Sequence, residues 1–250
     1  MMNIIGLIPV HLESIRLPNK AILEICGIPM ILHVAKRAQL SKTLDKLVVC
    51  TDSHIICDIC IKHQIEVVLT KSNHKNGTER IAEAADILNL DSDTLIIDIQ
   101  GDEPLLKPYM IDNVAKFLLN NKNFDIIVPF IEIFGEETHS RVKLVASDNN
   151  VIYMSRRNLP FPYKKDTIYK KHLSIIAFKR DALEKFSKNK PTTLEEIEGI
   201  ELLRAIEIGL KVGTFEEFGE IHSVDTKDDY ERVQRLMTID EIYNQMKNDI

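Results

Sequence analysis

The sequence predicts an α/β fold in which a mostly parallel sheet is flanked by helices and carries a small inserted β-rich lobe. Short apolar runs rich in valine and isoleucine alternate with segments of helical periodicity through the first 130 residues. That alternation is typical of parallel strands joined by helices. The runs are also almost continuously apolar, as expected of strands that are buried on both faces.

The order of the predicted elements follows from these runs. Strands are expected at residues 4–8, 47–50, 66–69, 95–99 and 126–130, with helices at 30–40, 55–63, 79–88 and 110–119. Later strands are expected at 142–146, 151–154, 174–178 and 211–218, with helices at 181–187, 194–208 and from about residue 227. No linker separates these parts, so we expect one domain over residues 1–250 with a lobe at about residues 131–180.

Composition narrows the class of function. The formal net charge is −6 and the isoelectric point is near 5.8, so there is no basic surplus for binding a nucleic acid. No cationic segment precedes the first apolar run, and Pro9 and His11 interrupt that run far short of a membrane span. We therefore expect a cytoplasmic protein with neither a membrane nor a nucleic-acid partner.

The four cysteines all lie in the first quarter of the chain, at positions 26, 50, 57 and 60. This is too local for a secreted disulfide framework. Cys57 and Cys60, with His63, resemble a metal clip, but a zinc site needs more ligands. The surrounding apolar residues have helical spacing, so we favour a core helix.

In a parallel sheet, ligands bind beyond the carboxyl ends of the strands, so the loops that follow the strands are searched first. The loop after the first strand carries Ser14, Arg16 and Lys20 between two prolines, without glycine. Arginine can donate two hydrogen bonds to phosphate oxygens, and lysine adds a compact charge. The loop therefore suits a triphosphate, although an ordinary exposed basic loop would look the same.

Two carboxylates are candidates for a magnesium site. Asp102 follows the strand at 95–99 in the sequence QGDEP, and Asp225 precedes the last predicted helix. A nucleotide-bound Mg²⁺ usually takes only one or two protein carboxylates. The alternatives are an acidic turn for Asp102 and a helix N-cap for Asp225.

Two further loops carry polar residues at strand or helix ends. Thr51 and Asp52 end the second strand, where they could contact a base, although Asp52 could instead cap the next helix. Thr78 is a possible cap of the helix that carries Arg80, and a helix N-terminus beside an arginine favours an anionic ligand. Arg80 could equally be an ordinary surface residue.

Together these signals resemble one family, the 3-deoxy-manno-octulosonate (Kdo) cytidylyltransferases, also called CMP-Kdo synthetases. The matching segments are spread over almost the whole chain. They are IPxxxxSxRLPxK at 8–20, PMIxHVxxRA at 29–38, TD at 51–52, GTERxAE at 77–83, QGDEP at 100–104, YxSR at 153–156, HL at 172–173, LRxxxxG at 203–209 and VDTxxDxERV at 224–233.

The resemblance implies a Rossmann-like fold of the nucleotide-diphospho-sugar transferase type and a homodimer to which the lobe contributes. It implies that CTP and Kdo react, with Mg²⁺, to give CMP-Kdo and pyrophosphate for lipopolysaccharide or capsule synthesis. Arg16, Lys20, Asp102 and Asp225 would be the catalytic residues, and the two aspartates would hold the metal. The nucleotide would be bound by Ser14, Arg16, Lys20, Thr51, Asp52, Arg80 and Gln100, and the sugar by Arg156, His172 and Glu201.

The chain departs from the family pattern at several positions, among them Ser174, where the family has glycine. His11 stands where the family usually has arginine, and Asn19 where it has glycine. Ile176 and Leu202 replace a tyrosine and a glutamine on the sugar side. The loss of polar contacts there could change the acceptor, because a site built to bind a hydroxyl discriminates strongly. The 8-amino analogue of Kdo or a nonulosonate is therefore an alternative acceptor.

Three rival functions are weighed against this one. A nucleotidylyltransferase acting on a sugar phosphate would typically carry a GxGxR first loop, which is absent here. A catalytically silent nucleotide-binding protein would tolerate the loss of Lys20, Asp102 and Asp225, yet all three are present. A dinucleotide oxidoreductase is disfavoured because no GxGxxG follows the first strand.

Overall fold

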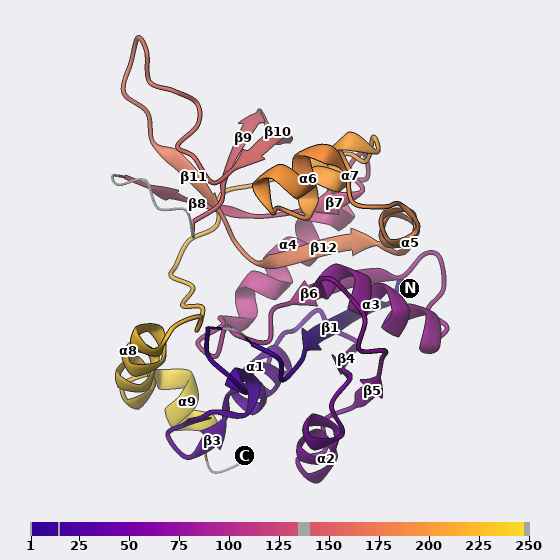
Figure 1. Cartoon of the computed structure of the whole chain (residues 1–250), viewed down its shortest axis with the longest axis vertical. Coiled ribbons are helices and arrows are strands. Elements are labelled where there is room, and N and C mark those ends of the chain that lie inside the picture. Colours follow the sequence, from indigo (N-terminus) through magenta and orange to yellow (C-terminus); the bar gives the residue numbers. More distant parts are fainter. Residues whose placement is uncertain (1, 15, 135–140, 248–250) are drawn as a thin grey trace.

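The computed structural model describes residues 2–14, 16–134 and 141–247. Its large sheet begins with four parallel strands in the order β5–β4–β1–β6. These strands are β1 (Ile4–Val10), β4 (Lys46–Thr51), β5 (Val67–Leu69) and β6 (Leu95–Ile99). They are the first four predicted strands, so the predicted α/β class with a parallel sheet is confirmed (Figure 1).

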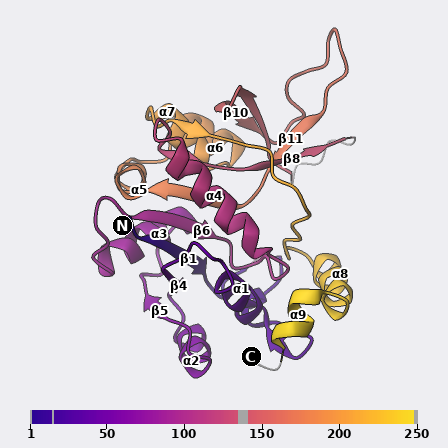
Figure 2. The same cartoon turned by 180° about the vertical axis from the view of Figure 1, so that it is seen from behind.

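Helices cover both faces of the sheet. Their bounds are α1 (Met30–Ala38), α2 (His54–Lys62), α3 (Gly77–Ile87), α4 (Pro108–Asn120) and α5 (Arg180–Lys188). Because side chains alternate along a strand, Ile4 and Ile8 of β1 pack with α1, α2 and α4, while Ile5 and Leu7 pack with α3 and α5. Figure 2 shows α1 and α4 on the face away from α3.

The sheet becomes mainly antiparallel beyond β6. It continues through β12 (Ile175–Lys179), β7 (Ile126–Ile127), β13 (Val212–Gly213), β10 (Asn150–Ser155), β9 (Lys143–Ser147), β11 (Tyr169–His172) and β8 (Phe130–Ile133). Phe130 of β8 also bridges to Glu216 just beyond β13. The last five strands in this order, β13, β10, β9, β11 and β8, therefore curl back on themselves, and we call them the β-rich lobe. Residues 135–140 of the predicted lobe lie outside the described residues.

The C-terminal helices fold back onto the start of the sheet. They are α8 (Lys227–Thr238) and α9 (Glu241–Met246), and they close a small core against the hairpin of β2 (Glu24–Ile25) and β3 (Ile28–Pro29). The segment before α8 is fixed by a hydrogen bond from Val224 N–H to Asp102 O, at 2.9 Å. Residues more than 120 positions apart are thus brought to one sheet edge.

Three predicted elements differ from the structure. The predicted strand at 126–130 is two strands, β7 and β8, which lie at different places in the sheet. The predicted helix at 194–208 is two helices, α6 (Thr193–Glu198) and α7 (Leu202–Glu207). Gly199 between them has φ 62°, a left-handed conformation that ends a helix and favours glycine. The predicted strand at 211–218 is reduced to Val212–Gly213, because only the bridge at Glu216 follows it.

Arg204 of α7 is buried to 1% exposure and holds three elements together. Its guanidinium donates two hydrogen bonds to Glu195, at 2.6 and 2.7 Å, contacts Glu79 of α3 at 3.3 Å, and lies over the Phe186 ring.

Changing Arg204→Met should lower the free energy of unfolding by about 3 kcal/mol, because Glu195 is left buried and unpaired. Chemical denaturation would measure this, with Arg235→Met as the control, and a loss below about 1 kcal/mol would contradict the assignment.

Two further predictions concern the cysteines and the membrane. Cys57 and Cys60 lie on α2, and Cys60 is buried in the core, so the interpretation as a helix is confirmed. Across residues 2–14, 16–134 and 141–247, no cluster of three or more His, Cys, Asp or Glu side chains could hold a metal ion. Within the same part of the chain, no helix has the length and hydrophobicity to cross a bilayer.

Candidate active site

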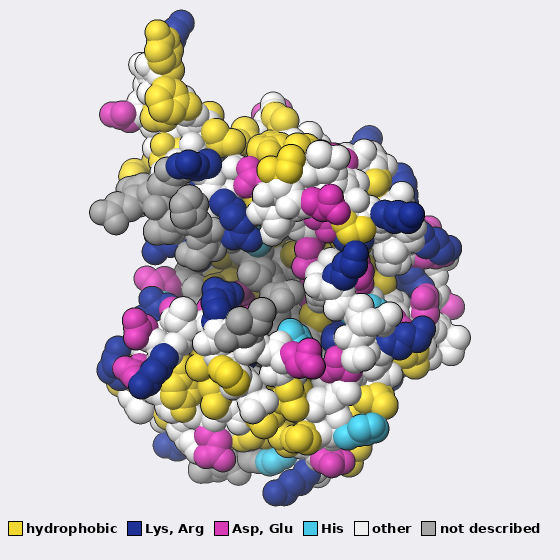
Figure 3. All heavy atoms as spheres, viewed as in Figure 1, with side chains coloured by type: hydrophobic (Ala, Val, Ile, Leu, Met, Phe, Trp, Pro, Cys, Tyr) yellow, Lys and Arg dark blue, Asp and Glu magenta, His cyan; other side chains and the backbone are white. Residues whose placement is uncertain are grey.

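Two cavities open at the carboxyl ends of the parallel strands, and they share a wall. The smaller has a volume of about 490 Å³ and the larger about 900 Å³. Gln100 and Asp102, directly after β6, line both cavities. Figure 3 shows this side of the molecule hollowed between the β-rich lobe and the rest of the chain. Two ligands bound in these cavities would meet at Asp102.

The loop after β1 borders the smaller cavity, as its position in the sequence predicts. His11 and Ser14 line this cavity, and Lys20 begins a short 3₁₀ helix, η1 (Lys20–Ile22). Asn19 has φ 57°, in the left-handed region that glycine and asparagine tolerate best. The replacement of the family's glycine by Asn19 is therefore compatible with the backbone of this loop.

Lys20 lies at the centre of a charged cluster at the junction of the two cavities. Its Nζ atom lies 2.6 Å from Asp102 Oδ2 and 3.2 Å from Asp225 Oδ1. Arg16 contacts the same Asp225 oxygen at 2.9 Å, from an exposed position on the side of the larger cavity. Burial lowers the pKa of Lys20, but Asp102 and Asp225 outweigh it and raise the pKa above 10.5. Lys20 therefore carries a positive charge at neutral pH.

Arg80 lines the far wall of the smaller cavity and is buried, not a surface residue. One nitrogen of its guanidinium donates to Asp52 Oδ2 at 3.0 Å, and another donates to Thr70 Oγ1 at 2.7 Å. The N-terminus of α3 lies beside it, since Asn76 and Gly77 line the same cavity. Asp52 and Arg80 are thus brought together as a fixed pair facing this space.

The predicted contact of Thr51 with a ligand does not fit the structure. Thr51 is fully buried, lines neither of the two cavities, and accepts a hydrogen bond from Ser53 N–H at 3.2 Å. It forms the turn into α2. Asp52, Thr78 and Asp225 were each considered as possible helix N-caps, and none of them is one. The N-caps of α2, α3 and α8 are Ser53, Asn76 and Thr226.

The larger cavity contains the three residues expected to bind the sugar. Arg156 lies at the end of β10 and donates to the carbonyl groups of Glu198 and Gly199, at 2.8 and 2.9 Å. Glu201 precedes α7 and accepts a hydrogen bond of 2.6 Å from Thr78 Oγ1. These residues come from the β-rich lobe and the segment before α7, whereas Gln100 and Thr78 of the same cavity come from the parallel half of the fold. The cavity therefore forms only when the lobe folds onto the parallel sheet.

His172 of β11 faces the larger cavity as a neutral ring. Burial lowers the pKa of His172 to about 4, and the nearby charges of Lys171 and Arg156 lower it too. A hydrogen bond to the Leu173 carbonyl acts in the opposite direction but is weaker. A neutral imidazole has one donor and one acceptor nitrogen. His172 can therefore bind a sugar hydroxyl without adding charge.

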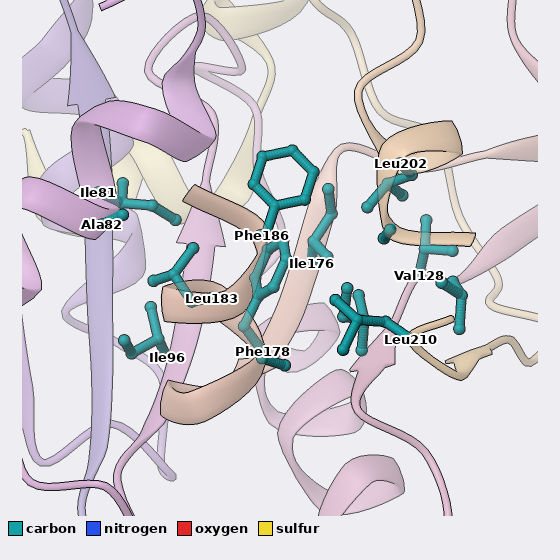
Figure 4. Close-up of a cluster of buried hydrophobic side chains, with 14 of the residues drawn as sticks. Ile81, Ala82, Ile96, Val128, Ile176, Phe178, Leu183, Phe186, Leu202 and Leu210 are labelled. Atoms are coloured by element: carbon teal, nitrogen blue, oxygen red, sulfur yellow. The ribbon is translucent and has the colours of Figure 1, made fainter. Parts of the chain in front are cut away.

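The two aliphatic replacements both lie in the wall of the larger cavity. Ile176 of β12 and Leu202 of α7 line the larger cavity at 8% and 4% exposure. Figure 4 shows both as part of the apolar cluster that contains Phe178 and Phe186. One wall of this cavity is thus a continuation of the hydrophobic core.

Several residues of the larger cavity were not anticipated from the sequence. Asp98, Glu103 and Lys171 line it, and the two carboxyl groups are almost fully buried. The signal for Asp98 was present, because one acidic residue interrupts an otherwise apolar strand. Glu103 gave no such signal, since it reads as part of an acidic turn.

Comparison with known proteins agrees with these features. The sequence model of a family described as cytidylyltransferase matches residues 5–218. The chain is 36% identical to the 3-deoxy-manno-octulosonate cytidylyltransferase of Polynucleobacter necessarius, covering 92% of this chain and 94% of the relative. The enzyme of the same name from Neisseria meningitidis serogroup A is also 36% identical, over 94% of this chain and 98% of its own.

Solved structures give the same result. A CMP:2-keto-3-deoxy-manno-octonic acid synthetase complexed with CTP superposes with a TM-score of 0.89 at 29% identity, covering 94% of this chain and 98% of the other. A cytidylyltransferase from Leptospira borgpetersenii superposes with a TM-score of 0.66 at 18% identity, over 100% of this chain and 95% of the other. The second likeness concerns the fold alone.

Proposed function

The chain belongs to the cytidylyltransferase family, alongside the 3-deoxy-manno-octulosonate cytidylyltransferases, and we propose that it transfers CMP from CTP to Kdo with release of pyrophosphate. The observation that carries this proposal is the junction of two cavities at Lys20 and Asp102. A transferase needs two binding sites that meet at one reacting atom. The product is an activated sugar for lipopolysaccharide or capsule synthesis.

CTP occupies the smaller cavity in this proposal. Ser14 and Lys20 bind the triphosphate from the loop after β1, and His11 adds a donor at the same rim. Arg16 approaches the phosphates from the junction, where it now contacts Asp225. Arg80 and Asp52 bind the nucleoside part from the far wall of the cavity, and Gln100 binds it from the wall shared with the larger cavity.

The acid sugar occupies the larger cavity. Arg156 and His172 of the lobe bind it together with Glu201, and the anomeric hydroxyl lies at the junction. The oxygen of that hydroxyl attacks the α-phosphorus of CTP and loses its proton to solvent. The bond from the α-phosphorus to the bridging oxygen breaks, and pyrophosphate leaves. Such a reaction depends on in-line positioning and on charge stabilisation more than on covalent help.

Lys20 supplies charge at the reacting phosphorus. Its ammonium group is held at the junction by two carboxylates, and its raised pKa keeps it protonated. Negative charge grows on the α-phosphate and on the leaving pyrophosphate, so a fixed cation there lowers the barrier.

Mg²⁺ is proposed as the cofactor, held by Asp102 and Asp225. These carboxylates fit a nucleotide-bound magnesium ion, because both contact one nitrogen atom of Lys20 and both are partly exposed, at 25% and 34%. Two carboxylates are enough when phosphates and water complete the octahedron. When bound, the ion would neutralise phosphate charge and orient the triphosphate.

Pyrophosphate release tests the proposed function. We expect purified protein with Mg²⁺ to release pyrophosphate when both CTP and Kdo are present. CTP alone, or CTP with glucose 1-phosphate, should give no pyrophosphate. N-acetylneuraminate serves as a second acid sugar. Release with a sugar phosphate instead of an acid sugar would replace the proposal by its nearest rival, and silence with every acceptor would support the catalytically silent alternative.

A homodimer is proposed in addition, formed through the β-rich lobe. The loop between β10 and β11 projects from the body of the molecule (Figure 1), and it carries Phe161 and Tyr163 at 75% and 83% exposure. Large apolar side chains gathered on a projecting segment are typical of interaction surfaces.

We expect sedimentation at micromolar concentration to give twice the chain mass. The double change Phe161→Ser and Tyr163→Ser should shift the protein to monomer, and a monomeric native protein would contradict the proposal.

A further inference from the structure

Three carboxyl groups form one wall of the larger cavity. Asp98 projects from β6, Glu103 follows that strand, and Glu201 precedes α7. Asp98 and Glu103 are each only 1% exposed. None of the three makes an ion pair within the described residues, in contrast to Asp102 and Asp225, which both contact Lys20.

The hydrogen bonds of these groups are incomplete. Asp98 accepts one from Gln100 Nε2 at 3.0 Å, and Glu201 accepts one from Thr78. Glu103 Oε1 lies 3.3 Å from Ser223 Oγ, and the Ser174 hydroxyl also interacts with this carboxyl group, but no well-formed hydrogen bond reaches its Oε2 atom in the part of the chain that the structure describes. A buried carboxyl oxygen without a partner is costly. A ligand that donates hydrogen bonds to this wall would remove that cost.

Electrostatics favours a positively charged donor here. Burial raises the pKa of Asp98 well above its usual range, and Glu201, Glu103 and Asp102 raise it further. Burial and Asp102 raise the pKa of Glu103 to about 8. Lys171 lines the same cavity but makes no ion pair with Glu103 within the described residues. Crowded carboxyl groups of this kind attract a cation, because a cation offsets both their burial and their mutual repulsion.

The aliphatic wall strengthens this preference. Ile176 lies directly opposite Asp98 in the register of β12 and β6, and Leu202 follows Glu201 in the chain. Neither side chain can bind a sugar hydroxyl, and both exclude water from the neighbouring carboxyl groups. Removing water strengthens the attraction between opposite charges.

An ammonium group matches this wall better than a hydroxyl does. It has three donors and one positive charge, whereas a hydroxyl has one donor and no charge. Within the described residues no three acidic side chains lie close enough to hold one ion, so the ammonium group would contact Asp98, with Glu103 and Glu201 acting on its charge from the same wall. A group on a freely rotating terminal carbon can turn toward Asp98 more easily than a group fixed on the sugar ring.

We propose that the preferred acceptor is an acid sugar with a protonated amino group on its terminal carbon, bound by Asp98 with help from Glu103 and Glu201. This inference rests on the proposed cytidylyl transfer. It makes Asp98 a specificity-determining residue of the larger cavity.

The test compares kcat/KM for three acceptors with CTP and Mg²⁺: Kdo, its 8-amino analogue, and the N-acetylated form of that analogue. The native protein should favour the 8-amino analogue over Kdo at least about tenfold, and the uncharged acetylated form should lose this advantage. In Asp98→Asn, the ratio of the 8-amino analogue to Kdo should fall about tenfold. Asp228→Asn, at the exposed rim of the same cavity, is the matched control and should keep the native ratio.

Equal use of Kdo and the amine by the native protein would overturn this inference and leave the proposed function intact. So would an unchanged ratio in a folded Asp98→Asn protein. No transfer to any of the three acceptors would instead overturn the proposed function. If Asp98→Asn does not fold, the comparison of acceptors on the native protein still decides the question.

Discussion

Replacing Asp102 by asparagine should lower kcat at least about a thousandfold, which corresponds to about 4 kcal/mol of lost transition-state stabilisation. Asp102 lies at the junction of the two cavities, where it contacts Lys20 at 2.6 Å and is proposed to bind Mg²⁺. Asparagine keeps the shape of the side chain but removes its charge. Both the metal and the orientation of Lys20 are then lost, and raising the concentration of Mg²⁺ should not restore the rate.

The fold should survive this change. The backbone carbonyl of Asp102, not its side chain, accepts the hydrogen bond from Val224, so thermal unfolding should stay within a few degrees of the native protein. Asp225→Asn should have a smaller effect, because Asp225 is more exposed and shares its charge with Arg16. Near-native turnover in folded Asp102→Asn would remove Asp102 from the reaction.

Replacing Lys20 by methionine should lower kcat about 100- to 1000-fold, the range found when one preorganised donor is removed from a transition state. Methionine has a similar length and no charge, so the loop after β1 should keep its shape. Stability should change little, since Asp102 and Asp225 are partly exposed and water can solvate them.

Two controls separate charge from geometry at position 20. Lys20→Arg should recover part of the rate, because the charge is kept but its position changes. The pKa of Lys20 is raised above 10.5, so its ammonium group stays protonated from pH 6 to pH 9 and should add no step to the pH profile there. A tenfold loss or less in Lys20→Met would show that Lys20 is not at the reacting phosphate.

The parallel half of the fold could be predicted because each strand is a short apolar run with a clear end. The loops after β1 and β6 could be predicted as a site for the same reason, since parallel strands end at one edge. Asn19 illustrates the limit of this reasoning. Its left-handed backbone was not apparent from the sequence, although it explains why asparagine can replace glycine there.

Contacts between distant residues could not be predicted. The closing of the β-rich lobe depends on a bridge from Phe130 to Glu216, and Arg204 pairs with Glu79 across 125 positions. No local pattern encodes such pairings. The helix capped by Ser53 is a smaller case of the same kind, because Asp52, for which a cap was the alternative role, pairs instead with Arg80.

The buried carboxyl groups of the larger cavity were missed for another reason. Asp98 is the one acidic residue of an apolar strand, but only the fold shows that Glu103 and Glu201 approach it from outside that strand. The meaning of an acidic residue in a strand thus depends on its neighbours in space.

A crystal structure with CTP and Mg²⁺ would test the central claim most directly, namely that nucleotide and acid sugar meet at Lys20 and Asp102. We expect the nucleoside in the cavity lined by Arg80, the triphosphate along the loop after β1, and the α-phosphate within hydrogen-bond distance of Lys20 Nζ. CTP bound in the larger cavity instead, with Lys20 distant from every phosphate, would contradict the account.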